Sequence, residues 1–300
     1  MERIQMADGL SFSRIVHGLW RLNEWNYSSQ QTLDLIHHAL DKGITTFDHA
    51  DIYGSYTCEE LFGDALSLEP SIREKIELVT KCGIVLESAN RPEHKSHHYN
   101  TSKAHIISSV ENSLKNLQTE YIDVLLIHRP DPFMDPEQTV EAFTQLKAQG
   151  KVRYFGVSNF KQHQFDLLQS YMDEKLITNQ IELSPLQLEN FEDGTLNLCM
   201  KERIAPMAWS PLSGGSIFSS QEERAARLRN VLQKISGEIG AESIDQVMYA
   251  WLLAHPAKIM PIVGSGKTAR IDAAVDSLSL KMNHDQWFEI LQTSMGHDVP

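Results

Sequence analysis

Asp48, Tyr53, Lys81 and His128 are side chains whose types suit the protonation of a carbonyl oxygen. A phenol with an ordinary pKa of about 10 is a weak acid at neutral pH, and a neighbouring ammonium group favours its ionised form. If the four side chains converge, we expect Lys81 to lower the pKa of Tyr53 and Asp48 to hold Lys81 charged and in place. His128 can then hydrogen-bond a carbonyl oxygen that Tyr53 protonates. The set therefore predicts carbonyl reduction, with Tyr53 as the general acid, or as the general base in the reverse direction.

Each of these residues also has an ordinary structural explanation when taken alone. Asp48 could cap a helix, Lys81 could extend its amine to solvent, and His128 could be a hydrogen-bonded core histidine. Their joint placement favours chemistry, because Lys81 and His128 follow the largely apolar runs 76–79 and 124–127, where an unpartnered polar group is costly to bury. Asp48 offers the opposite charge.

The four residues lie at or just beyond the ends of short apolar segments, which alternate with amphipathic helical patterns at intervals of about 30 residues. Eight strands are expected, at 14–20, 44–50, 76–82, 121–128, 152–158, 177–183, 204–210 and 259–264. Helices are expected near 29–42, 58–66, 102–118, 136–149, 161–172, 195–202, 243–255 and 267–278.

This alternation over 300 residues predicts an α/β fold, a closed (β/α)8 TIM barrel whose chemistry sits at the carboxyl ends of its strands. A Rossmann sheet is the alternative, but the segment His17-Gly18-Leu19-Trp20-Arg21 after the first strand lacks that fold's G-x-G-x-x-G. We expect one barrel domain over residues 1–300, because no Pro-rich or Ser-rich linker divides the chain. An Asp8-Gly9 turn predicts an N-terminal β-hairpin, and 221–239 and 284–294 are additional helices near the C-terminus.

The segment Phe47-Asp48-His49-Ala50-Asp51-Ile52-Tyr53-Gly54 resembles the signature of the aldo-keto reductase family, in which an aspartate precedes the catalytic tyrosine by five residues. Segments 78–81 and 121–128 are similar to the strands that bear its catalytic lysine and histidine. Segments 156–160 and 179–182 resemble its G-[VI]-S-N-[FY] and N-Q-x-E motifs. The resemblance covers nearly the whole chain and extends to bacterial members that carry Trp20-Arg21-Leu22 near the start and His128-Arg129-Pro130-Asp131-Pro132 after the fourth strand.

The resemblance implies NADP(H) as the cofactor and a small carbonyl compound as the substrate. By position, it implies that Ser158, Asn159 and Gln180 bind the nicotinamide carboxamide, with Trp209 stacked on the ring. The residues implied for the rest of the cofactor are Ser210, Leu212 and Gly214 along the pyrophosphate, Ser265, Lys267 and Arg270 at the adenosine 2′-phosphate, and Gly264 and Trp20 beside them.

Four residues depart from the family pattern. Gly264 stands where many relatives have a lysine, and Ala273-Ala274 stands where some have a Glu-Asn pair that reaches the adenine. The expected preference for NADP over NAD therefore rests on Lys267 and Arg270. His49 replaces a threonine that is common after the motif aspartate, and the sequence leaves open whether it contacts substrate or packs.

Bulk properties exclude several classes of function. The formal charge of −13, without a basic stripe, argues against nucleic-acid binding. No apolar run or secretory signal is present, so we expect a soluble cytoplasmic protein that does not enter a membrane. Cys58, Cys82 and Cys199 fit reduced core thiols. His94, His97 and His98 lack acidic or cysteine partners at ligand spacing, so no metal is expected. The loop 83–101, with Trp20 and Trp25, is expected to line the substrate pocket.

Two other functions stay open at this level. A nicotinamide-binding regulatory or sensor subunit would use the same fold with little turnover, as the family's potassium-channel β subunits do. A Schiff-base lyase would use Lys81 as a nucleophile, which an adjacent carboxylate disfavours by keeping the amine protonated. The sequence does not fix the oligomeric state, and a monomer is among the possibilities.

Overall fold

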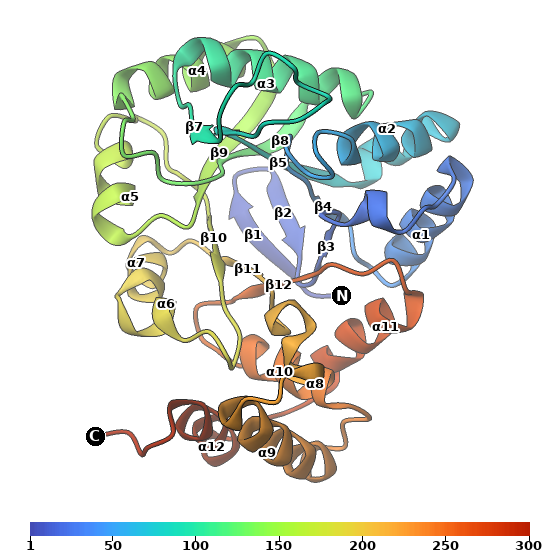
Figure 1. Ribbon diagram of the computed structural model, residues 1–300, viewed down its shortest axis with the longest axis vertical. Coiled ribbons are helices and arrows are strands. Elements are labelled where there is room, and N and C mark those ends of the chain that lie inside the picture. Colours follow the sequence, from blue (N-terminus) through green and yellow to red (C-terminus); the bar gives the residue numbers. More distant parts are fainter.

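Eight parallel strands close into a barrel in the computed structural model, which describes residues 1–300 (Figure 1). The strands pair around the ring in the order β3, β4, β5, β8, β9, β10, β11 and β12, and β12 returns to β3. Their bounds are β3 Val16–Gly18, β4 Thr46–Asp48, β5 Glu77–Cys82, β8 Ile122–Ile127, β9 Val152–Ser158, β10 Asn179–Glu182, β11 Met207–Trp209 and β12 Met260–Val263. The predicted (β/α)8 barrel is confirmed.

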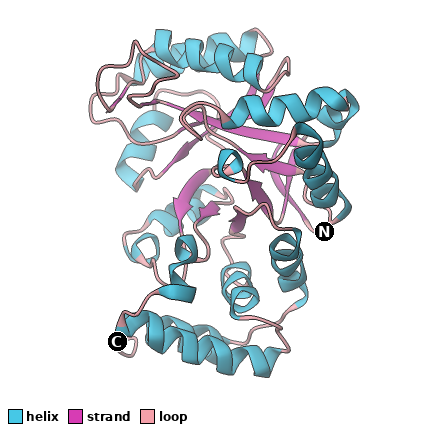
Figure 2. Cartoon of the chain, turned by 45° about the vertical axis from the view of Figure 1, so that its right-hand side comes forward, coloured by secondary structure: helices cyan, strands magenta, loops and turns pink.

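Helices surround the strands as an outer layer (Figure 2). Those that follow the barrel strands are α1 Ser29–Asp41, α2 Cys58–Leu68, α3 Lys103–Asn116, α4 Pro136–Ala148, α5 Gln162–Gln169, α6 Glu189–Glu192, α7 Thr195–Glu202, α8 Ser216–Ser219, α10 Ile244–Leu253 and α11 Thr268–Asp276. Local sequence sets several starts. Ser28 and Gln31 form a capping box at α1, and the Ser102 hydroxyl accepts a hydrogen bond from the backbone N–H of His105 at α3. Short 3-10 turns lie at η1 Leu22–Glu24, η2 Pro70–Lys75, η3 Ser213–Gly215 and η4 Ser277–Ser279.

The predicted N-terminal hairpin closes the amino-terminal end of the barrel. Strands β1 Arg3–Ala7 and β2 Leu10–Ser13 pair antiparallel, and in Figure 1 they lie inside the ring of barrel strands. Side chains from both hairpin strands, including the fully buried Phe12, pack with Val79, Val124 and other residues inside the barrel. The opposite end of the barrel, which holds the carboxyl ends of the strands, is not covered by this hairpin.

Two further helices, α9 Glu223–Ile239 and α12 His284–Met295, pack against each other beside the barrel (Figures 1 and 2). They match the additional helices expected near the C-terminus. Lys234 of α9 forms an ion pair with Glu289 of α12. None of the helices combines the length and the apolar character that crossing a bilayer requires.

Candidate active site

A cavity of about 690 Å³ opens at the carboxyl ends of the barrel strands. Asp48 at the end of β4, His128 just after β8, Ser158 at the end of β9 and Trp209 at the end of β11 all line it. Tyr53 reaches it from the loop between β4 and α2. Strands that are far apart in sequence thus bring their polar ends to one hollow, as the barrel geometry predicts.

Tyr53, Lys81 and Asp48 are directly hydrogen-bonded. The Lys81 Nζ lies 2.9 Å from the Tyr53 hydroxyl oxygen and 2.9 and 2.8 Å from the two carboxylate oxygens of Asp48. It also donates to the backbone carbonyl of His49 at 2.6 Å. Because the tyrosine oxygen accepts from lysine, the phenol keeps its own proton available for a partner in the cavity. Lys81 itself is fully buried behind the cavity wall.

Burial and charge act in opposite directions on these groups. Burial would lower the pKa of Lys81, but the negative charge of Asp48 and the hydrogen bonds to Asp48 and Tyr53 raise this pKa above its ordinary value. Burial raises the pKa of Tyr53, and the Lys81 charge lowers it. Lys81 therefore lowers the pKa of Tyr53 as expected, but burial outweighs it, so the pKa stands above its ordinary value. Spacing in the sequence does not reveal how deeply the phenol is buried.

His128 faces Tyr53 edge-on, with the two ring centroids 5.9 Å apart. Burial lowers the pKa of His128 well below its ordinary value, and the positive charges of Lys81 and Arg129 lower it further. The imidazole is therefore neutral at physiological pH and keeps one N–H to donate.

The residues that the resemblance assigns to the nicotinamide carboxamide form one hydrogen-bond chain. The Ser158 hydroxyl donates to the backbone carbonyl of Gln180, Asn159 Nδ2 donates to that hydroxyl, and Trp209 Nε1 donates to Asn159 Oδ1 at 3.0 Å. Gln180 Nε2 in turn donates to Asp48 Oδ1 at 2.7 Å. These hydrogen bonds fix the amides and the indole relative to the ion pair of Lys81 and Asp48, and their donors and acceptors fit a carboxamide.

The remaining expected cofactor residues, except Lys267, also line the cavity. Ser210, Leu212, Gly214 and Gly215 line it after β11, and the two glycines have φ values of 64° and 94°. No atom lies within 4 Å of where a Cβ would stand at either glycine, so their backbone is open to a close-lying group. Trp20, Gly264, Ser265 and Arg270 line the cavity as well. The open glycine backbone and the hydroxyl and guanidinium donors fit the phosphate groups of a dinucleotide.

Lys267 and Trp25 do not reach this cavity. Lys267 is exposed just before α11, and its backbone N–H donates to the Ser265 hydroxyl. Trp25 packs beside His17, in a stacked arrangement, and close against Gly266. The expectation that Trp25 lines the pocket is therefore wrong in this structure: its ring is held under the loop that follows β12.

Two other expectations are resolved by packing. His49 is fully buried, with its ring against Phe62 of α2 at 4.5 Å between centroids, so it packs and does not contact the cavity. The loop 83–101 contributes only Ile84 to the cavity wall, and within this loop β6 Ile84–Val85 pairs with β7 His98–Tyr99. Cys82, like Cys58 and Cys199, is buried as expected.

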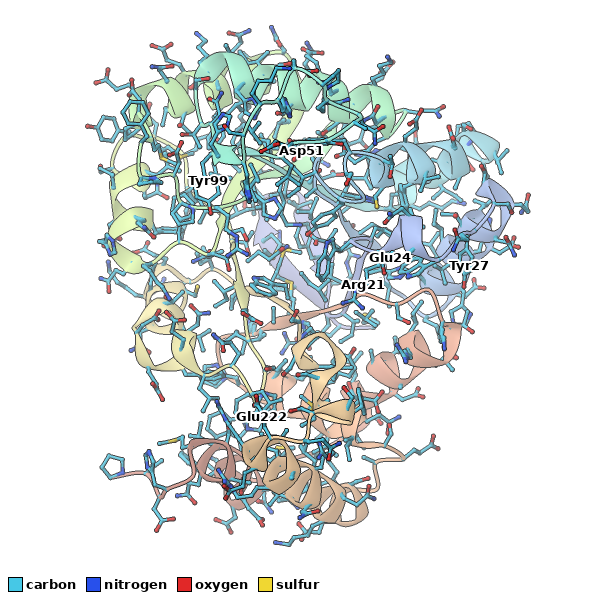
Figure 3. All side chains as sticks on the ribbon, viewed as in Figure 1. Arg21, Glu24, Tyr27, Asp51, Tyr99 and Glu222 are labelled. Carbon is cyan, nitrogen blue, oxygen red and sulfur yellow. The ribbon has the colours of Figure 1, made fainter.

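Several cavity residues were not singled out from the sequence. Arg21 and Arg129 lie in the loops after β3 and β8, and Figure 3 shows Arg21 over the ring of barrel strands. Both residues follow the carboxyl ends of barrel strands, and this placement is the signal from which they could have been predicted. Asp245 and Tyr249 line the cavity from α10, where nothing in a helical pattern distinguishes a cavity residue from a surface or core residue.

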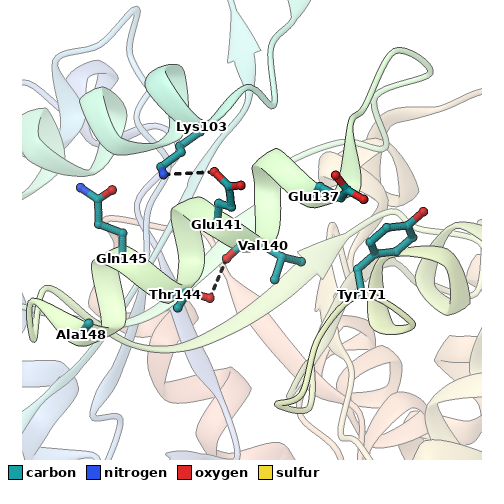
Figure 4. Close-up of a pocket in the computed structure, with 8 residues that line it drawn as sticks. All are labelled: Lys103, Glu137, Val140, Glu141, Thr144, Gln145, Ala148 and Tyr171. Atoms are coloured by element: carbon teal, nitrogen blue, oxygen red, sulfur yellow. Dashed lines mark hydrogen bonds and ion pairs between the residues drawn. The ribbon is translucent and has the colours of Figure 1, made fainter.

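A second hollow, of about 530 Å³, lies on the outer surface of the barrel at α4 (Figure 4). Lys103 of α3 pairs with Glu141 across it at 3.1 Å, and Tyr171 borders it beyond α5. It includes none of the candidate catalytic or cofactor-binding residues. The cavity at the strand ends is therefore the candidate active site.

Comparison with known proteins assigns the family. The aldo/keto reductase family model matches residues 14–294. The chain is 65% identical to an uncharacterized oxidoreductase, YcsN, of Bacillus subtilis (strain 168) and 49% identical to oxidoreductase YdhF of Escherichia coli (strain K12). It is 45% identical to a 6-dehydroglucose reductase of Agrobacterium fabrum. Each match covers 100% of both chains.

A solved structure of the thermostable aldo-keto reductase Tm1743, in complex with the inhibitor epalrestat, superposes with a TM-score of 0.82 at 26% identity. The match covers 98% of this chain and 100% of that one. The chain therefore belongs to the aldo-keto reductase family. The predicted resemblance to bacterial members of the family is confirmed by the full-length match to YdhF.

Proposed function

We propose that this chain is a cytoplasmic NADP(H)-dependent oxidoreductase, which transfers hydride between nicotinamide and an aldehyde or ketone, or the corresponding alcohol. One observation carries the proposal: a buried ammonium group, Lys81 Nζ, lies 2.9 Å from the Tyr53 hydroxyl and 2.8 Å from an Asp48 oxygen, at the wall of a large cavity. A phenol in this setting can release a proton and leave an oxyanion that the ammonium stabilises.

In the reductive direction, a bound reduced nicotinamide would supply hydride to the carbonyl carbon. Tyr53 passes its proton to the carbonyl oxygen as negative charge develops there, and Lys81 stabilises the phenolate left behind. Neutral His128 donates its N–H to the same oxygen and orients it toward Tyr53. Asp48 keeps Lys81 charged and fixed through both of its carboxylate oxygens. In the oxidative direction the phenolate takes the proton from the alcohol.

For the cofactor, we assign the carboxamide contacts to Ser158, Asn159 and Gln180, and the ring contact to Trp209. The open backbone at Gly214 suits the pyrophosphate. Ser265 and Arg270 supply a hydroxyl and a guanidinium for a 2′-phosphate, an arrangement that favours NADP(H) over NAD(H). Lys267 lies outside the cavity wall but follows Ser265 closely enough to add charge to the same loop.

For the substrate, we favour a polar, polyhydroxylated carbonyl compound. Arg21 and Arg129 both line the cavity, with the Arg129 guanidinium 5.6 Å from the centre of the Trp209 ring. Guanidinium groups present several donors to hydroxyl or carboxylate oxygens. Two full-length relatives, at 45% and 36% identity, are 6-dehydroglucose reductases, whose substrate by name is a sugar carbonyl.

Tyr53→Phe tests the proposal. The variant should bind NADPH as the wild type does, by fluorescence titration, while NADPH consumption across a carbonyl panel that includes 6-dehydroglucose falls roughly a hundredfold or more. Tyr99→Phe, which removes the same hydroxyl group from an exposed tyrosine, is the matched control and should keep full activity. Near-normal turnover by Tyr53→Phe would contradict the proposed role. A wild type that binds NADPH but reduces no carbonyl compound would favour a regulatory subunit.

A further inference from the structure

The cavity wall includes a carboxylate, Asp245, that the family resemblance does not assign. Asp245 lies in the first turn of α10 and lines the cavity together with Arg270 of α11. Tyr249, one helical turn further along α10, lines the same cavity and is buried. One face of α10 therefore forms this part of the wall.

Neither charged group here has a partner within the chain. The Asp245 carboxylate is half-buried and takes part in no side-chain hydrogen bond or ion pair, and the Arg270 guanidinium, although it lines the same cavity, is not paired with it. Other acidic residues nearby are paired: Asp272 on α11 accepts from His38 at 2.8 Å and pairs with Lys42. The Asp245 carboxylate is therefore free to accept a hydrogen bond from a ligand in the cavity.

This inference rests on the proposed NADP(H) function. The groups at the adenosine end of that cofactor determine which hydrogen-bond donor can meet Asp245. A 2′-phosphate suits Arg270 and is repelled by Asp245. The 6-amino group of adenine is a neutral hydrogen-bond donor, and a carboxylate readily accepts a hydrogen bond from it. On α11, Ala273 and Ala274 have no side-chain acceptor at the place where some relatives carry a Glu-Asn pair for the adenine. We propose that Asp245 accepts a hydrogen bond from the adenine 6-amino group and so selects adenine at this part of the cavity wall.

The test compares NADPH with its reduced hypoxanthine analogue, in which a carbonyl oxygen replaces the 6-amino group. Dissociation constants are measured for the full chain by fluorescence titration. The wild type should prefer NADPH by roughly tenfold or more, because the analogue sets an oxygen against the carboxylate. Asp245→Ala should bind NADPH roughly tenfold more weakly and lose the preference. Asp245→Asn, whose amide can accept or donate, should bind both dinucleotides with similar affinity.

Asp272→Ala is the matched control, because it removes a carboxylate from α11 outside the cavity and should leave the NADPH-to-analogue ratio unchanged. A wild-type preference that persists in Asp245→Ala overturns the inference and leaves the proposed function intact. If Asp245→Ala changes only the ratio of the NADPH and NADH dissociation constants, the inference is also overturned, because the carboxylate then faces the ribose. If the wild type binds none of these dinucleotides, the proposed function fails, and the inference fails with it.

Discussion

Two buried carboxylates near the end of β4, Asp48 and Asp51, have opposite surroundings. Asp48 is 3% exposed and is bound through both oxygens by the fully buried Lys81. Asp51, 8% exposed, has one carboxylate oxygen without a hydrogen-bond partner and lies near a second buried acid, Glu59 of α2. Glu59 accepts from the Thr80 hydroxyl at 2.6 Å. Figure 3 shows Asp51 close to α2.

The difference follows from the alternation of side chains along β5. Thr80 and Lys81 are consecutive, so they point to opposite faces of the strand. Lys81 hydrogen-bonds with Asp48 and Tyr53 on one face, and Thr80 hydrogen-bonds with Glu59 of α2 on the other. Burial raises the pKa of Glu59 to about 7, and it raises the pKa of Asp51 well above its ordinary value, with the charge of Glu59 adding to the effect. Burial raises the pKa of Asp48 too, but there the charge of Lys81 and the hydrogen bonds from Lys81 and Gln180 oppose it, whereas at Asp51 the charge of a second acid adds to it.

The largest expected effect comes from removing the cation. Lys81→Met leaves the buried Asp48 without a cation and Tyr53 without an ammonium, so carbonyl turnover should fall roughly a thousandfold. The free energy of unfolding should fall by about 3–5 kcal/mol. Steady-state kinetics and urea unfolding measure the two effects.

Lys103→Met is the control for the loss of a lysine. Its ion pair with Glu141 is largely exposed, so its removal should change the free energy of unfolding by less than ~1 kcal/mol. Equal losses of stability in the two variants would mean that the buried pair at Asp48 is not distinct from a surface ion pair.

Glu59→Gln should stabilise the protein, and the sign depends on pH. The pKa of Glu59 rises from 4.5 to about 7 on folding, so the wild type keeps its full stability below about pH 4.5 and loses stability as the pH rises through 7. At about pH 8 the variant should be more stable by up to ~3 kcal/mol, and near pH 4.5 the two should be nearly equal. Urea unfolding at both pH values measures this.

Glu60→Gln is its control, because Glu60 is the exposed neighbour of Glu59 on α2 and should show no such pH dependence. If Glu59→Gln were less stable than the wild type at about pH 8, the two acids would not be repelling each other or resisting burial.

Asp51→Asn should also stabilise the protein at about pH 8, and the double variant with Glu59→Gln should gain less than the sum of the single changes. The reason is that removing either acid relieves the same repulsion. A double-mutant cycle at about pH 8 should give a coupling free energy of about 1 kcal/mol. Strict additivity would show that burial alone raises the pKa values of the two carboxyl groups.

The barrel and the candidate tetrad of Asp48, Tyr53, Lys81 and His128 could be predicted because both depend on local signals. Strand and helix periods repeat along the chain, and parallel strands in a closed barrel bring their carboxyl ends together whatever their separation in sequence. Trp25 could not be placed this way, since an aromatic residue in a loop can turn into the cavity or under it. Asp245 was missed because a first-turn acid reads as an ordinary helix start.

By itself, the sequence determined which residues stand at the strand ends, the order of the strands and the chemical types available to one site. Only the tertiary structure decided which polar groups meet. It paired Lys81 with Asp48 and Tyr53, sent Thr80 to Glu59, packed His49 against Phe62 and set the pKa of Tyr53 above its ordinary value. The physical reason is that burial and close charge act over a few ångströms in space, and sequence spacing does not measure those distances.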